Sequence, residues 1–147
     1  GGQSKPWKKR ILFATDGSVI CETAVELAAQ IAKASWLPVT VLSVIGKDGN
    51  RQKSEEDVAQ KAAFLKAAGV ACDTRVVEGV PSETILRILD EVGADLVVIG
   101  NNQSKGLTRT IAGSTTDKVI GRIACPVLVV KRQPEPEKMT AAVKNQA

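Results

Sequence analysis

The amino-acid sequence predicts an α/β fold in which a single domain forms a doubly wound parallel sheet of five strands, with helices on both faces. Short runs rich in Val and Ile alternate with segments whose apolar residues recur every three to four positions, the pattern of strands alternating with amphipathic helices. One run, residues 96–99, is apolar throughout, as expected for a parallel strand covered on both faces. A chain of 147 residues can bury such a core without disulfides or a metal.

The predicted elements alternate along the whole chain. Strands are predicted over residues 10–15, 39–45, 71–78, 95–100 and 126–131. Helices are predicted over residues 21–35, 54–68 and 114–123, with one more after the turn at residues 79–82. Because strands joined through helices favour right-handed crossovers, this order predicts parallel pairing.

Local residues mark the ends of several elements. Ser54 and Asp57 have the spacing of a capping box and predict the start of the second helix, and Gly69 fits its C-cap. The turn at residues 16–18 follows the first strand and is also able to cap the next helix. Apolar and polar residues alternate over residues 72–76, which predicts an edge strand.

The chain is divided into three parts. Residues 1–9 are interpreted as a flexible leader or tag remnant, residues 10–132 as the domain, and residues 133–147 as a polar tail.

The net charge of +4 comes from the start of the chain. The charge comes from Lys5, Lys8, Lys9 and Arg10, because residues 11–147 carry sixteen charges of each sign. With a neutral domain and few aromatic residues, a nucleic-acid partner is not expected.

Cysteine and histidine content excludes several kinds of site. The chain has no histidine, which removes Ser-His-Asp and Cys-His catalysis and histidine metal ligands. Cys21, Cys72 and Cys125 are widely spaced, so neither a disulfide framework nor a zinc site is expected, and a reducing, cytoplasmic location fits. No run approaches the roughly 20 apolar residues of a membrane helix.

Residues 95–123 read as a buried strand, a polar loop and a helix that opens with Gly-Ser-Thr-Thr, an arrangement typical of a binding pocket. The first amides of a helix have no partner and are suited to binding an anion, although Ser114 alone would equally serve as an N-cap. In doubly wound sheets, ligands bind beyond the carboxyl ends of the strands, where the strand order reverses. Asp16 and Gly100 would flank that crevice if their strands are neighbours.

Four motifs resemble the universal stress protein family. They are Ala-Thr-Asp-Gly-Ser at 14–18, Val-Val-Ile-Gly at 97–100, Gly-Ser-Thr-Thr-Asp-Lys-Val at 113–119 and Cys-Pro-Val-Leu-Val-Val at 125–130. The resemblance covers nearly all of residues 8–132. It implies strand order 3-2-1-4-5, a homodimer formed through strand five at Val127, Leu128, Val129 and Val130, and, in one branch of the family, ATP binding.

The ATP-binding branch carries Gly, two residues, Gly, nine residues and then Gly-Ser or Gly-Thr. Gly100 and the Gly113-Ser114 pair match this pattern, but Gln103 replaces the middle glycine. Glycine at that position would permit positive φ or close approach of phosphate. Gln103 could donate its amide to a phosphate oxygen, or it could mark a loss of binding.

The resemblance implies a set of nucleotide-binding residues. Asp16 would bind ribose or adenine, the main chain of Val44 would meet the adenine edge, and Ile99 would line the base pocket, with a helix cap the alternative for Asp16 and a core residue for Val44. Phosphates would be held by main-chain amides and hydroxyls. The expected binding residues are Ala14, Thr15, Asp16, Val44, Ile99, Gly100, Asn102, Gln103, Gly113, Ser114, Thr115 and Thr116.

The leading hypothesis is a cytoplasmic regulatory protein that binds ATP, ADP or AMP, with Mg²⁺ held through the phosphates. Asp16 is the only carboxylate expected in the crevice, so no catalytic residue is named and at most slow ATP hydrolysis is expected. One alternative is a dimeric interaction module without nucleotide. Another is a regulatory domain excised from a membrane transporter, suggested by the leader and by Met139 being the only methionine.

Overall fold

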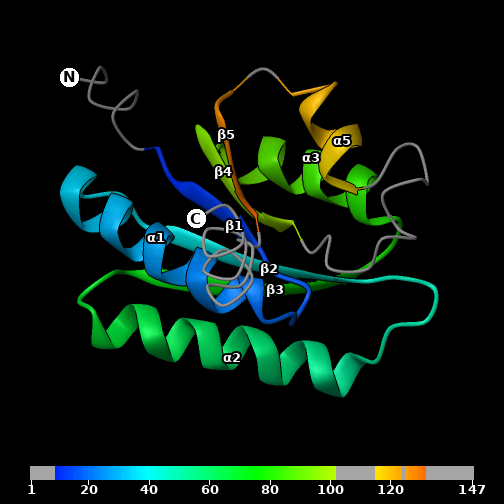
Figure 1. Cartoon of the computed structure of the whole chain (residues 1–147), viewed down its shortest axis with the longest axis horizontal. Helices are drawn as coiled ribbons and strands as arrows, with labels where there is room; N and C mark the ends of the chain where they lie inside the picture. Colours follow the sequence, from blue (N-terminus) through cyan, green and yellow to red (C-terminus); the bar gives the residue numbers. More distant parts are fainter. Residues whose placement is uncertain (1–8, 102–114, 124, 132–147) are drawn as a thin grey trace, which may run out of the picture.

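The computed structural model describes residues 9–101, 115–123 and 125–131, without the side chains of 101, 115–117 and 131. A five-stranded sheet of order β3-β2-β1-β4-β5 runs through them, and every pairing is parallel (Figure 1). The predicted fold class and strand order are confirmed. The elements are β1 (Ile11–Ala14), α1 (Ile20–Ser35), β2 (Val39–Ile45), α2 (Arg51–Ala67), β3 (Cys72–Glu78), α3 (Pro81–Val92), β4 (Leu96–Asn101), α5 (Thr115–Ile120) and β5 (Val127–Lys131).

Strand β1 lies at the centre of the sheet. Its first residue, Ile11, is in register with Val39 of β2 on one side and with Leu96 of β4 on the other. Ile11, Leu12 and Phe13 are completely buried because both faces of the strand are covered. The chain leaves β1 at the point where the strand order reverses, so the β1–α1 turn opens onto the crevice where doubly wound folds bind ligands.

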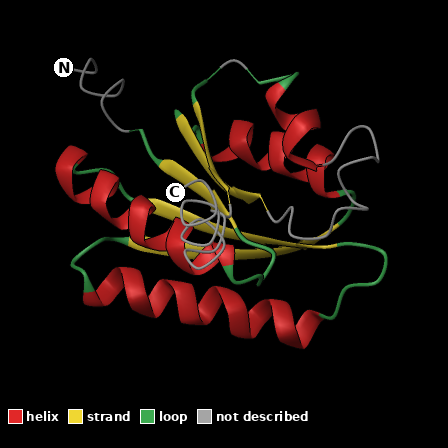
Figure 2. Ribbon diagram, viewed as in Figure 1, coloured by secondary structure: helices red, strands yellow, loops and turns green. Residues whose placement is uncertain are grey.

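Helices cover the sheet in two layers. Helices α1 and α2 lie on one face and α3 and α5 on the other (Figures 1 and 2). Phe13 and Val41 belong to the core under α1 and α2, whereas Leu12 and Leu42 belong to the core under α3 and α5. Alternate residues of the central strands therefore supply two separate cores.

The start of α2 differs from the prediction. The helix begins at Arg51, and the side chain of Asn50 caps it by accepting a hydrogen bond from the Lys53 amide at 3.0 Å. The capping box predicted at Ser54 is therefore wrong, because the loop supplies an earlier cap and the Asp57 carboxylate bonds elsewhere. The predicted C-cap is one position late, since Ala68 is the C-cap and Gly69 follows it with a φ of +85°.

Other boundaries shift by smaller amounts. Helix α1 has no side-chain cap, so the turn at residues 16–18 does not cap it, and β4 continues past Gly100 to Asn101. Strand β3 is at the edge of the sheet, as predicted. The leader up to residue 8 and the tail at 133–147 lie outside the described residues. Among the described helices, none is both long and apolar enough to cross a membrane.

Candidate functional site

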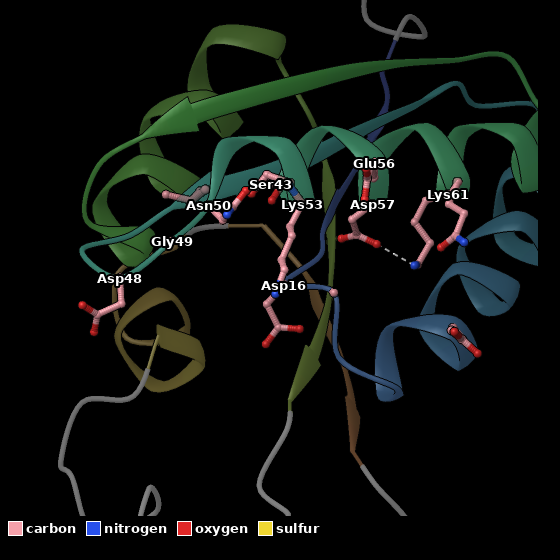
Figure 3. A pocket seen from close by; sticks show the side chains of 14 residues that line it. Asp16, Ser43, Asp48, Gly49, Asn50, Lys53, Glu56, Asp57 and Lys61 are labelled. Atoms are coloured by element: carbon pink, nitrogen blue, oxygen red, sulfur yellow. Dashed lines mark hydrogen bonds and ion pairs between the residues drawn. The ribbon is translucent and has the colours of Figure 1, made fainter.

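A cavity of about 520 Å³ opens at the carboxyl ends of β1 and β2 (Figure 3). Its walls come from the β1–α1 turn, the end of β2, the β2–α2 loop and one side of α2. The lining residues are mostly polar: Asp16, Gly17, Glu22, Ser43, Val44, Asp48, Gly49, Asn50, Lys53, Ser54, Glu56, Asp57, Gln60 and Lys61. Asp16 lies in this cavity as predicted. Gly100, the other residue expected to flank the crevice, does not line it, because the cavity lies on the side of β2 and α2.

Asp16 is held in a defined orientation at the mouth of this cavity. Its Oδ1 accepts hydrogen bonds from the Ser18 amide at 2.9 Å and from the Cys21 thiol at 3.3 Å. Within the described part of the chain, no donor contacts Oδ2. Because one oxygen is occupied and the other is open, the carboxylate can accept a hydrogen bond from a ligand without first breaking one of its own.

A buried ion pair supports the turn from behind. The Lys61 ammonium donates to Asp57 Oδ1 at 2.7 Å, and the two side chains are only 6% and 11% exposed. Asp57 Oδ2 accepts a hydrogen bond from the Thr15 hydroxyl at 2.8 Å, and the Thr15 oxygen accepts one from the Gly17 amide at 3.2 Å. This Thr15–Asp57–Lys61 network ties α2 to the two residues that flank Asp16.

Cys21 lies between Asp16 and β4. Burial, and then the neighbouring Asp16 charge, raise the pKa of its thiol, so it stays protonated and able to donate to Asp16. A Cβ added to Gly100 would lie 3.1 Å from Cys21 Sγ and 3.1 Å from Ile20 Cγ2. Gly100 therefore allows the first turn of α1 to pack closely on β4, which gives this glycine a structural role.

The described part of the cavity is acidic. Five lining carboxylates outnumber the two lining lysines, and the charge of Lys61 is already paired with Asp57. The prediction that Asp16 is the only carboxylate in the crevice is therefore wrong, because α2 carries Glu56 and Asp57 to it and the loop carries Asp48. A neutral polar group is favoured here over a phosphate, which like charges would repel.

The structure brings together only some of the predicted site residues. Asp16 and Val44 line the cavity, and Val44 is half-buried at the end of β2. Ala14 and Ile99 are paired in register and are buried in the core under α3 and α5, whereas Thr15 lies behind the cavity in the ion-pair network. Outside the described residues lie Asn102, Gln103, Gly113, Ser114 and the side chains of Thr115 and Thr116.

Sequence reasoning missed the buried ion pair between Asp57 and Lys61. The residues that α2 buries are Val58, Lys61, Ala62 and Leu65, so the lysine occupies a position in the apolar stripe. A charged residue in such a stripe, four positions after an aspartate, indicates a buried pair. That spacing could have identified the Asp57–Lys61 pair. Among the residues that the structure describes, no three Cys, Asp or Glu side chains are placed so that together they could hold a metal ion.

Comparison with known proteins identifies the family. A model of the universal stress protein family matches residues 8–131. The chain belongs to the universal stress protein family. Universal stress protein MJ0531 of Methanocaldococcus jannaschii is 30% identical over 140 residues, covering 84% of this chain and 82% of that protein. Universal stress protein Sll1654 of Synechocystis is 35% identical over 133 residues, covering 83% and 85%.

A solved structure of the same family is similar over most of the chain. It is a universal stress protein in complex with cAMP, which matches with a TM-score of 0.72 and 26% identity, covering 83% of this chain and 96% of the other. That relative therefore binds an adenine nucleotide.

Proposed function

We propose that this universal stress protein is a cytoplasmic regulatory protein in the stress response that binds an adenine nucleotide, with the nucleoside end in the cavity beside Asp16 and Val44. The observation that carries the proposal is the Asp16 carboxylate, whose Oδ2 accepts no hydrogen bond from the described residues. It lies in a cavity at the carboxyl ends of β1 and β2, beside the point where the strand order reverses between β1 and β4. The cAMP complex of a relative supports adenine as the base. The three free cysteines fit a reducing compartment.

The acidic cavity favours one orientation of the ligand. Asp16 Oδ2 accepts a hydrogen bond from a ribose hydroxyl or from the adenine amine, and the main chain of Val44 meets the base edge. The phosphates point away from the carboxylates, toward Gly100 and the loop. Their proposed ligands are Gly100, Asn102, Gln103, Gly113, Ser114, Thr115 and Thr116, with Mg²⁺ held mainly by phosphates and water.

Calorimetric titration with ATP, ADP, AMP and cAMP, with and without Mg²⁺, tests the proposal. Asp16→Ala should weaken binding about tenfold or more, which is about 1.4 kcal/mol, because a charge-assisted hydrogen bond is lost. Asp48→Ala is the matched control, since it removes an exposed carboxylate from the same cavity and should leave affinity nearly unchanged. Absence of binding by all four nucleotides would refute the proposal.

Two further measurements define the chemistry. Gln103→Gly restores the glycine of the ATP-binding pattern and should tighten ATP binding if Gln103 obstructs the phosphates. The proposal assigns no catalytic residue, so phosphate release from ATP should stay far below the turnover of about 1–100 s⁻¹ typical of kinases. Turnover at ordinary enzyme rates would contradict a purely regulatory role.

We also propose that the protein forms a homodimer through β5, either together with nucleotide binding or as its principal function. Strand β5 is an edge strand, and Val127, Leu128 and Val129 are only half-buried. An exposed apolar edge otherwise invites uncontrolled pairing, so a defined dimer would protect it. Sedimentation at micromolar concentration should give the mass of two chains, and Val129→Lys should give the mass of one.

A further inference from the structure

The end of α1 carries an exposed tryptophan in a disfavoured conformation. Trp36 is 91% exposed and has φ 59° and ψ 36°, the left-handed region that bulky residues rarely occupy. Gly69 after α2 and Gly93 after α3 have comparable positive φ values of 85° and 67°. Two helices of this fold thus turn left-handed with glycine, the residue suited to that turn, and α1 does so with tryptophan.

Neither folding nor the nucleotide cavity accounts for Trp36. The backbone of the turn is satisfied without the side chain, since the amides of Trp36 and Leu37 both donate to Ala32. An exposed indole buries little apolar surface, so it does not offset the strained backbone. The nucleotide cavity lies at the carboxyl end of the sheet, whereas α1 ends at the opposite, amino end, at the left of Figure 1.

Trp36 forms one wall of an apolar groove of about 550 Å³. The groove lies between the ends of α1 and α2 and the starts of β2 and β3, and it is lined by Ala32, Leu37, Pro38, Val70 and Ala71. Its volume is within the usual range of about 300–1,000 Å³ for ligand sites. Tryptophan beside an apolar recess is the composition typical of an interface hot spot.

Among the described residues, Lys33 is the only charged residue that lines the groove. Lys66 lies outside the lining, in the last turn of α2, and Asp73 follows at the start of β3, where it is paired with Arg10 at 3.2 Å. Both lysines are exposed, and neither forms an ion pair within the described residues. Lysine in a last turn also stabilises the helix end, and Lys33 in addition lines the groove. No described carboxylate lines the groove.

We infer that this groove, named here the Trp36 groove, docks an acidic peptide segment of a partner protein, with one large apolar side chain of the segment packed against Trp36. The recess accepts the apolar anchor, and Lys33 and Lys66 attract the carboxylates beside it. Two other occupants fit less well. A second copy related by two-fold symmetry would bring like-charged rims together, and a flat bilayer surface would leave the recess unfilled.

Selection from a phage-displayed library of random dodecapeptides tests this inference on the full chain. The library is first depleted on the Trp36→Gly variant, which should fold because glycine suits the left-handed turn. Peptides then retained by the parent should share Asp or Glu beside a large apolar residue. A synthetic consensus peptide should bind about tenfold more weakly to Trp36→Gly and to Lys33→Glu. Asp16→Ala, at the opposite end of the sheet, should bind the peptide like the parent.

Several results would overturn the inference. These are the absence of any peptide specific to the parent, a consensus without acidic residues, or an affinity that Lys33→Glu leaves unchanged. Trp36-dependent sedimentation with vesicles of phosphatidylcholine and phosphatidylserine, without peptide enrichment, would assign the groove to membranes. Self-association that disappears in Trp36→Gly would assign it to a second copy. None of these results depends on nucleotide binding.

Discussion

The Asp16 cavity at the carboxyl end of the sheet and the Trp36 groove at its amino end are built on opposite principles. At the carboxyl end, the polar side chains hold one another: Asp57 joins Thr15 to Lys61, and Asp16 is fixed by Ser18 and Cys21. At the amino end, the Trp36 groove is mostly apolar, and Trp36, which is 91% exposed, stands on a strained backbone. The comparison teaches that a preorganised site contributes to stability, whereas a docking surface can carry a cost in stability.

The largest expected change in stability comes from a substitution at the carboxyl end of the sheet. Asp57→Ala leaves the buried Lys61 ammonium without its partner, which should lower the free energy of unfolding by about 3 kcal/mol. Urea denaturation followed by circular dichroism measures the change. The double variant Asp57→Ala/Lys61→Met, in which no buried charge remains, should recover most of the loss.

Glu56→Ala is the matched control for this pair. Glu56 is the preceding residue on the same helix, lines the same cavity, is exposed, and accepts a hydrogen bond from Gln52 at 3.3 Å. Its removal should change stability by no more than about 0.5 kcal/mol. An equally small change for Asp57→Ala would show that the buried pair does not hold the site, and the contrast between the two ends would fail.

A smaller effect is expected for Thr15→Val, which keeps the shape of the side chain but removes its hydroxyl. Asp57 Oδ2 loses a donor and the Gly17 amide loses an acceptor, so stability should fall by about 1–2 kcal/mol. Nucleotide affinity should fall with it, because the turn that presents Asp16 is loosened. Thr23→Val, on the exposed face of α1, is the control in both measurements. If Thr15→Val leaves nucleotide affinity unchanged, the Thr15–Asp57–Lys61 network does not support the binding site.

Sequence pattern predicted the fold well because burial on both faces of a parallel strand leaves a continuous apolar run, which the residues themselves display. It also placed Asp16 at the cavity, because the carboxyl ends of neighbouring strands meet at one edge, whereas Val44 was expected there from the family resemblance. The Thr15–Asp57–Lys61 network could not be derived as a contact, since it joins residues 42 positions apart whose approach depends on how α2 packs. The helix-start prediction failed for a related reason, since Asn50 and Ser54 are both competent caps and only the path of the loop selects between them.

The left-handed turn at Trp36 could not be predicted either, because tryptophan gives no indication of positive φ.

The smallest expected change in stability is at Trp36, and it is an increase. Trp36→Gly relieves a backbone strain of roughly 1–2 kcal/mol. Glycine also has more freedom in the unfolded chain, which lowers stability by about 0.4–1 kcal/mol. The free energy of unfolding should therefore be about 0.5–1 kcal/mol higher than in the parent. Trp36→Ala removes the same side chain but keeps the strained backbone, so it should gain little. Equal stability of both variants and the parent would mean that the turn is unstrained, and the tryptophan would then carry no cost that a docking function must explain.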